Sequence, residues 1–177
     1  MSYTGSRRAN ATMKFPRVSG SNLDGDHLPL PGWFDGDPTL LLISFQWQQR
    51  SLVDPWCSVA DRLAARYDDF EYYELLVVDW RSRMLIGRTR RADLLTTDQH
   101  DRMVVLRVNK RQFRQSLGLL GEDTVYALLL DDDYVVRQAA GFPVSSTIDG
   151  LRTLLEEWED ARPPTGVEAG QTTNSTG

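Results

Sequence analysis

The sequence predicts an α/β protein whose central mixed β-sheet is covered by helices on both faces. Apolar runs of strand length alternate with segments whose apolar residues recur at helical spacing, a pattern typical of strands joined by helices. The runs at 39–45 and 72–79 are almost continuously apolar, which indicates strands buried on both faces. Two later runs flank the acidic turn 131–133 and predict an antiparallel hairpin, so the sheet is mixed.

Each element follows from its local pattern. An N-terminal hairpin is predicted over 15–37, where short apolar stretches are separated by an Asp24-Gly25 turn. Asp54 before Pro55 is a favourable N-cap and first-turn pair for a helix. The remaining elements are strands at 39–45, 72–79, 103–108, 125–130 and 134–139, helices at 55–67, 110–119 and 146–160, and a weak helix or loop at 81–95.

Length and composition favour one domain over residues 14–160. The chain has 177 residues, of which 41% are hydrophobic and 25% charged, as is ordinary for a globular domain. Residues 1–13 are small and polar and are expected to form a flexible tail, and 161–177 have no apolar pattern and are expected to be disordered. No apolar run has the length of about 18 residues that a membrane span needs. The N-terminus has no apolar signal-peptide core, so we expect a cytoplasmic protein.

Cys57 is the only cysteine, which excludes an intrachain disulfide. If the helix begins at Asp54 and Pro55, Cys57 lies in its first turn, where the helix dipole lowers the pKa of a thiol. The Asp54 carboxylate raises that pKa, and no second cysteine is present to resolve a sulfenic acid. Two interpretations remain: a reactive thiol, or a buried residue packed beside Trp56 and Ala60.

Segments near both ends of the predicted domain resemble the thioredoxin-like superfamily. The stretch TVYALLLDDDYVVRQAAGFP resembles the closing hairpin of peroxiredoxins and of membrane-anchored thioredoxin relatives. The resemblance covers residues 15–160 and implies a three-layer sandwich with an N-terminal β-hairpin extension. The entry segment of those proteins is matched by the run TLLLISFQW and, ahead of it, by Phe15-Pro16, Leu23-x-Gly25, Leu30 and Gly36.

The residues that carry redox chemistry in thioredoxins are missing from this chain. Phe45 and Tyr67 reproduce, without a gap, the thioredoxin interval between the end of the first core strand and the end of the helix. The two redox cysteines of thioredoxins then map onto Arg50 and Val53. Thioredoxins also place a cis-proline where this chain has residues 122–124, which contain no proline. The resemblance therefore implies a member that has lost the Cys-x-x-Cys site.

A narrower resemblance is to the mitochondrial ATP-synthase assembly factor family, a thioredoxin-like group without Cys-x-x-Cys. The matching stretches are FPRVSGSNL, SFQ, DPW, YYEL and LLLDDDYVVRQAAGFP. The last departs from that family's pattern, which favours Arg-Trp near the end of the hairpin, because here Gln138 follows Arg137. This resemblance implies a domain that binds a protein partner, and it does not carry over a target.

A polar and aromatic cluster follows the first core strand, at the edge where thioredoxin-like domains meet their substrates. Trp and Arg are frequent anchors of protein interfaces, and side-chain amides can hold a peptide by hydrogen bonds. We therefore expect a contact surface. The alternative is that the indole packs in the core and the glutamines only solvate a loop. The candidate binding residues are Trp47, Gln48, Gln49 and Arg50.

Basic residues are concentrated between positions 81 and 114. This segment contains ten basic and only three acidic residues, although the whole chain has a net charge of −5. A segment of this kind can steer an anionic partner such as an acidic protein. The alternative is that its arginines pair with the acidic C-terminal helix or are simply solvated. No run of aromatic residues is interleaved with them, so we do not expect nucleic-acid binding. The candidate electrostatic patch is Arg83, Arg88, Arg90, Arg91, Arg111 and Arg114.

The leading functional hypothesis is a binding or assembly module with no catalytic residue and no cofactor, whose partner is another protein. The alternative is a one-cysteine, peroxiredoxin-like thiol peroxidase that uses Cys57. The thioredoxin spacing favours the first, because Val53, Ala60 and Ala64 then surround Cys57 on the helix and predict a buried, inert thiol. We expect no metal site, since His27 and the other histidine are not at ligand spacing.

Overall fold

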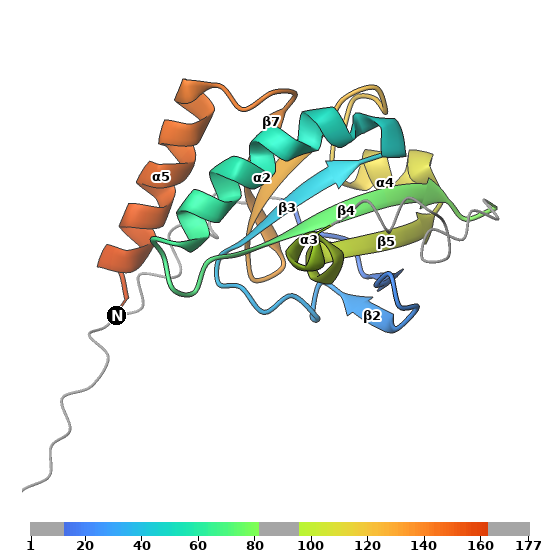
Figure 1. The fold of residues 1–177 in the computed structure, drawn as a ribbon, viewed down its shortest axis with the longest axis horizontal. Coiled ribbons are helices and arrows are strands. Elements are labelled where there is room, and N and C mark those ends of the chain that lie inside the picture. Colours follow the sequence, from blue (N-terminus) through green and yellow to red (C-terminus); the bar gives the residue numbers. More distant parts are fainter. Residues whose placement is uncertain (1–12, 82–95, 163–177) are drawn as a thin grey trace, which may run out of the picture.

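The computed structural model describes residues 13–81 and 96–162, which form a seven-stranded mixed sheet with helices on both faces (Figure 1). The strand order is β2-β1-β5-β4-β3-β6-β7. β3, β4 and β5 are parallel, whereas β6 and β7 continue the sheet antiparallel to β3. The central strands are β3 (Thr39–Ser44), β4 (Glu71–Asp79), β5 (Met103–Val108), β6 (Tyr126–Asp131) and β7 (Tyr134–Ala140).

The predicted N-terminal hairpin is confirmed as an extension of this sheet. It consists of β1 (Val18–Ser21) and β2 (His27–Leu30), and β1 pairs antiparallel with β5. Its turn contains Gly25, which has a φ of 94° and donates its N–H to the carbonyl of Asn22. Only glycine adopts this left-handed backbone without a steric cost, so the Asp-Gly pair correctly marked the turn.

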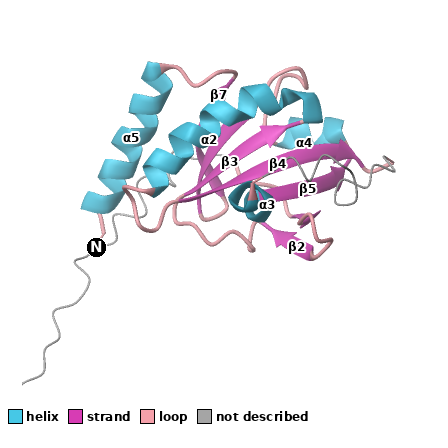
Figure 2. Ribbon diagram, viewed as in Figure 1, coloured by secondary structure: helices cyan, strands magenta, loops and turns pink. Residues whose placement is uncertain are grey.

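Helices cover the sheet in two layers, which confirms the predicted three-layer architecture (Figure 2). α2 (Arg50–Ala64) and α5 (Ser145–Asp160) pack on one face through an apolar cluster that includes Trp56. α4 (Lys110–Ser116) packs on the other face through Phe113. The β-strands begin and end within one residue of their predicted positions because a buried apolar run is a strong local signal.

The predicted start of one helix was wrong, and another helix was not predicted. α2 begins at Arg50 rather than near Pro55, and the proline lies inside the helix. The helix can start early because a 3-10 turn over Trp47–Gln49 leads into it. α3 (Thr97–Arg102) lies where the sequence analysis predicted no element, and its start is closed by a reciprocal capping box between Thr96 and Gln99.

Several sequence-based predictions lie outside the described residues. These are most of the weak element at 81–95 and of the two tails at 1–13 and 161–177. Four members of the predicted electrostatic patch are in the same category: Arg83, Arg88, Arg90 and Arg91.

Candidate functional site

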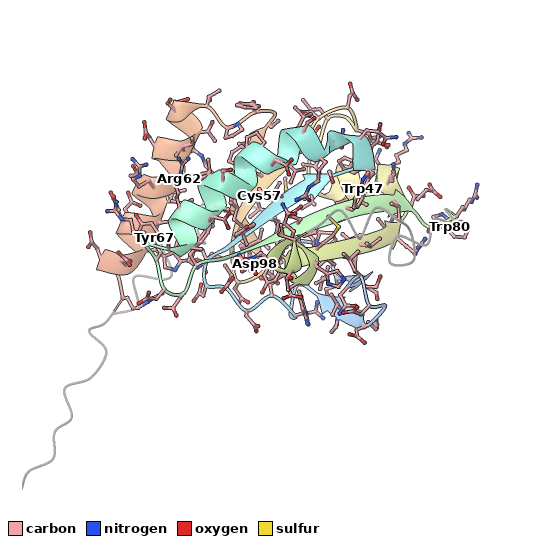
Figure 3. All side chains as sticks on the ribbon, in the orientation of Figure 1. Trp47, Cys57, Arg62, Tyr67, Trp80 and Asp98 are labelled. Atoms are coloured by element: carbon pink, nitrogen blue, oxygen red, sulfur yellow. The ribbon has the colours of Figure 1, made fainter. Side chains whose placement is uncertain are left out.

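The candidate site lies at the end of the sheet toward which β3 and β4 point. β6 starts and β7 ends at the same edge, because Tyr126 pairs with both Ile43 and Ala140. In sheets with parallel strands, ligands generally bind beyond the carboxyl ends of the strands. Three loops, 45–50, 117–125 and 141–144, therefore form this edge, and Figure 3 places Trp47 and Trp80 there.

Gln49 holds two of these loops together and is not a surface residue. Its side-chain oxygen accepts the backbone N–H of Phe45 at 2.8 Å and that of Gln46 at 3.2 Å. Its amide nitrogen donates to the carbonyl oxygen of Glu122 at 2.6 Å. Only 7% of the residue is exposed. The expectation that Gln49 contributes to an exposed contact surface is therefore wrong, because its amide satisfies backbone groups at the end of β3.

Arg50 is also committed to internal contacts. Its guanidinium forms a two-pronged ion pair with both carboxylate oxygens of Glu74, and its Nε lies 3.0 Å from Asp54. Glu74 projects from β4 beneath α2 and is only 3% exposed. Asp54 does not cap the helix as predicted. It lies one turn inside α2 and neutralises Arg50 from the solvent side.

Cys57 lies behind this ion pair, two turns into α2 rather than in its first turn. The residue is 6% exposed, and its Sγ donates to a carboxylate oxygen of Glu74 at 3.3 Å. Burial raises the pKa of the thiol, and the Glu74 carboxylate raises it further, while Arg50 lowers it in part. The prediction of a buried thiol is confirmed. Its surroundings are not wholly apolar, because the Glu74 carboxylate contacts it, and this contact was not predicted from the sequence.

Two of the four candidate binding residues do reach the surface. Gln48 is exposed, and Trp47 is half-buried, with its packed side against an apolar cluster that includes Leu23 and Met103. The contact surface therefore stays a prediction, whereas core packing, the alternative, holds in part for Trp47. Its indole is anchored by the core and still offers a face to solvent.

The described part of the basic segment is largely neutralised. Lys110 donates to the carbonyl oxygen of Phe45 at 2.9 Å and pairs with Glu122 at 3.3 Å. Arg114 pairs with the same carboxylate at 3.2 Å, whereas Arg111 is exposed. The two patch residues that the structure describes therefore differ: Arg114 is half-buried and paired with Glu122, whereas Arg111 is exposed.

Exposed apolar side chains also lie at this edge, and they were not predicted from the sequence. Within residues 13–81 and 96–162, the large hydrophobic residues that are exposed are Leu120 at 94%, Trp80 and Phe142 at 57%, and Val144 at 53%. Leu120 and Phe142 lie on loops that meet where Thr124 approaches Gly141. The local signal was present, because GLLG and GFPV each place a large apolar residue in a segment rich in glycine or proline.

Trp56 fixes one of these loops from below. Its indole nitrogen donates to the carbonyl oxygen of Gly141 at 2.7 Å, although the indole is otherwise buried beneath α2. Phe142 and Val144 are therefore held on an anchored loop, and an anchored apolar side chain loses little conformational entropy on binding.

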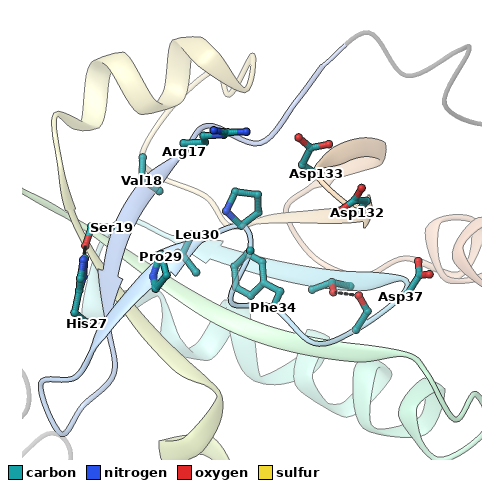
Figure 4. A pocket seen from close by; sticks show the side chains of 14 residues that line it. Arg17, Val18, Ser19, His27, Pro29, Leu30, Phe34, Asp37, Asp132 and Asp133 are labelled. Carbon is teal, nitrogen blue, oxygen red and sulfur yellow. Dashed lines mark hydrogen bonds between the residues drawn. The ribbon is translucent and has the colours of Figure 1, made fainter.

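A separate cleft lies at the opposite edge of the sheet, where β3 begins. It has a volume of about 930 Å³ and lies between the β1–β2 hairpin and the β6–β7 turn. Figure 4 shows Arg17 and His27 on one side, Asp132 and Asp133 on the other, and Phe34 between them. This cleft shares no lining residue with the candidate site.

The described segments contain neither a metal-ligand cluster nor a membrane-spanning helix. Residues 13–81 and 96–162 contain no cluster of three or more histidine, cysteine or acidic side chains placed to hold a metal ion. In the same segments, no helix is both long and apolar enough to cross a bilayer.

Neither a protein-family model nor a curated protein matches the sequence, but solved structures resemble the fold. A putative electron transfer protein from Aquifex aeolicus VF5 superposes with a TM-score of 0.59 at 13% identity over 86% of this chain and 99% of its own. BsSco, a member of the Sco family of cytochrome c oxidase assembly proteins with a disulfide switch, gives 0.56 at 13% identity over 86% and 95%.

A third structure is the thioredoxin domain of a thiol-disulfide oxidoreductase from Bacteroides vulgatus, with a TM-score of 0.55 at 13% identity over 82% of this chain and 97% of its own. At such low identity these likenesses establish the fold alone. They do not test the narrower resemblance to ATP-synthase assembly factors, which stays a prediction. The order of strands and helices, the edge formed by three loops and these superpositions together establish that the chain has a thioredoxin-like fold.

Proposed function

We propose that this protein is a binding or assembly module that uses the thioredoxin-like edge for non-covalent recognition of another protein. The observation that carries the proposal is the state of Cys57. It is the only thiol in the chain, it is buried, and it donates a hydrogen bond to Glu74. Because the thiolate is the nucleophile in thiol chemistry, a thiol whose pKa is raised by burial has little reactivity.

The composition of the edge supports recognition by contact. Leu120, Phe142 and Val144 are exposed apolar side chains on two adjoining loops, and Trp47 and Gln48 lie on the third loop. Aromatic and large apolar side chains on anchored backbone are typical of the energetic centre of a protein interface. The preferred partner is therefore a protein segment with apolar side chains, flanked by groups that can pair with exposed amides.

The peroxidase alternative requires that Cys57 reach peroxide. The thiol is 6% exposed and donates to Glu74, whose carboxylate is paired with Arg50, so bringing the thiol to solvent requires a movement that disrupts these buried contacts. Such a movement is costly because an unpaired buried charge is strongly destabilising. This observation disfavours the alternative.

The first experiment tests for chemistry. The native protein and Cys57→Ala are compared in peroxide consumption with an added thiol and in reduction of a protein disulfide. We expect neither protein to turn over. Alkylation of Cys57 should be slow in the native state and should become fast in denaturant. Turnover by the native protein that is lost in Cys57→Ala would establish the peroxidase instead.

The second experiment tests the surface. A displayed peptide library is selected on the native protein, and the selected peptides are titrated against Phe142→Ser and Leu120→Ser. Because both side chains are exposed, these variants should fold normally, and we expect affinity to fall at least about tenfold. Arg17→Ser, in the opposite cleft, is the matched control and should bind normally. Selected peptides that bind all variants equally would refute the assignment of this edge.

A further inference from the structure

The cleft at the start of β3 has two walls of different charge. Arg17 and His27 belong to the wall that the β1–β2 hairpin forms, and Asp132 and Asp133 belong to the wall that the β6–β7 turn forms (Figure 4). The ring of Phe34 lies between the two walls. A molecule in this cleft therefore meets a guanidinium at one end, carboxylates at the other end and an apolar surface between them.

Strand alternation places the polar groups of the hairpin wall on one face. Ser19 and His27 are exposed, whereas Leu28 is buried. Because successive side chains of a strand point to opposite faces, Arg17, two residues before Ser19 and also exposed, projects from the same face as Ser19. The Ser19 hydroxyl oxygen lies 2.9 Å from Nδ1 of His27 and holds the imidazole beside it. The positive wall is thus a consequence of the hairpin register.

The acidic wall is tied to the hairpin by the segment that precedes β1. Asp132 and Asp133 form a two-residue turn, in which Asp132 has a φ of 58°. The carbonyl oxygen of Asp133 accepts the N–H of Phe15 at 2.7 Å, and its carboxylate lies 3.1 Å from the Lys14 ammonium. Residues 14 and 15 lead directly to Arg17, so the same short segment joins the two walls.

The apolar floor of the cleft is also held in place. The ring of Phe34 packs against those of Phe15 and Tyr73, with centroids 6.0 Å and 5.0 Å away. Its backbone N–H donates to the carbonyl oxygen of Pro31, another residue that lines the cleft, at 3.0 Å. Because the walls and the floor are fixed by these contacts, a ligand does not have to order them, and the conformational cost of binding is small.

The size and charges of the cleft define a class of ligand. Its volume of about 930 Å³ lies within the range of about 300–1,000 Å³ that is typical of small-molecule sites. We propose that the cleft binds a small dipolar molecule with a carboxylate at one end, an ammonium group at the other and an apolar group between them. A tripeptide with free ends has this chemistry, and its three residues span about 10 Å when extended.

Each part of such a molecule has a counterpart in the cleft. The Arg17 guanidinium presents two parallel N–H donors to the carboxylate. Asp132 and Asp133 accept hydrogen bonds from the ammonium group, and Phe34 packs against the apolar side chain. The proposal is independent of the proposed function, because no residue lines both this cleft and the loop edge at the opposite end of the sheet.

Titration of the full, isotope-labelled chain with the tripeptide Ala-Phe-Ala, followed by NMR, tests the proposal. The backbone amide signals of Arg17, Gly32 and Asp132 should shift, whereas those of Leu120 and Phe142 at the loop edge should not. Acetylation of the peptide's amino end, or amidation of its carboxyl end, removes one terminal charge. Each modification should weaken binding at least about tenfold.

Variants assign each end of the peptide to one wall. Arg17→Gln should weaken binding of the free peptide about tenfold and leave the affinity for the amidated peptide unchanged, because that peptide has no carboxylate to lose. Asp132→Asn should act in the same way on the free and the acetylated peptides, and asparagine tolerates the left-handed backbone at this position. Arg111→Gln is the matched control, since Arg111 is an exposed arginine outside the cleft.

Four outcomes would overturn the proposal. The tripeptide could cause no shifts at high concentration, or it could bind equally well with both ends blocked. Arg17→Gln could weaken the free and the amidated peptides to the same extent, which would indicate a structural role for Arg17. Finally, the shifts could be confined to the loop edge, a result that would refute this proposal and support the proposed function.

Discussion

The two faces of the central sheet are built differently, and β4 shows the contrast within one strand. Tyr73, Leu75 and Val77 face α4 in an apolar cluster. The alternate residues face α2 and include Glu74, a buried carboxylate with two ionic or polar partners. On the face toward α4, these three residues pack by apolar contact, which is not directional, apart from the hydrogen bond that the Tyr73 hydroxyl accepts from the N–H of Asp35. The face toward α2 adds directional bonds.

Those bonds explain how the helix is positioned. Arg50 is the first residue of α2, and its paired guanidinium ties the helix start to the middle of β4. Removing two charges from water is costly, so the pair is not expected to add much net stability over apolar residues of similar size. Its effect is to set where α2 begins, and therefore where Trp47 and Gln48 are presented.

The largest expected effect comes from the apolar face. Leu75→Ala removes a fully buried side chain from close packing and should lower the free energy of unfolding by about 3–4 kcal/mol. Urea denaturation followed by tryptophan fluorescence measures this loss. A loss below about 1 kcal/mol would mean that this face repacks freely, contrary to the description of a close-packed layer.

The neighbouring residue probes the other face. Glu74→Leu removes the buried partner of Arg50, which then pairs only with the exposed Asp54, and should cost about 3 kcal/mol in the same measurement. The double variant Arg50→Met/Glu74→Leu should recover to within about 1 kcal/mol of the native protein, because neither charge then remains. If the double variant were as unstable as the single one, the pair would be a net source of stability rather than a positioning device.

A smaller effect is expected at the thiol. Cys57→Ala should reduce stability by about 1 kcal/mol, since it leaves a small cavity and removes one hydrogen bond to Glu74. Peptide binding at the loop edge should be unchanged, as measured by titration. Loss of binding in this variant would show that the thiol supports the surface more directly than the contacts indicate.

The smallest effect is a change in alkaline sensitivity. Burial raises the pKa of Cys57 and that of Tyr72 above their ordinary values, so both groups keep their protons in the folded state after the unfolded chain has lost them. Stability is therefore fully present below the ordinary thiol pKa of about 8.5 and falls as pH rises above it. Denaturation midpoints between pH 7 and 10 should decline less steeply for Cys57→Ala than for the native protein. Equal slopes would contradict this assignment.

The fold was accessible from sequence because its signals are local. The apolar runs at 39–45 and 72–79 and the acidic turn before β7 predicted strands in nearly their observed places. The start of α2 could not be predicted from the sequence, because Asp54 and Pro55 form a good local cap and indicate a later start than the observed Arg50. The tertiary bond from Gln49 to Glu122, across 73 residues, overrides it.

The candidate site was only partly predictable. Trp47 and Gln48 were correctly placed at the loop edge, but Gln49 and Arg50 have the same polar character and face inward. Sequence spacing cannot distinguish the two residues that reach the surface from the two that face inward. Whether an amide side chain faces water or a buried carbonyl group depends on what packs above it. The exposure of Leu120 and Phe142 was missed for the same reason.

By itself, the sequence determined the alternation of strands and helices, the antiparallel hairpin and the absence of a cysteine pair. Each of these follows from residue type and from the spacing of apolar residues along the chain, which do not depend on contacts between distant segments. Only the tertiary structure decided that Cys57 donates to a buried carboxylate and that Arg50 is internal, because both depend on Glu74, which is 24 residues from Arg50 in the chain. A buried charge takes its effect from the groups that surround it, and those groups come together only when the sheet and helix pack.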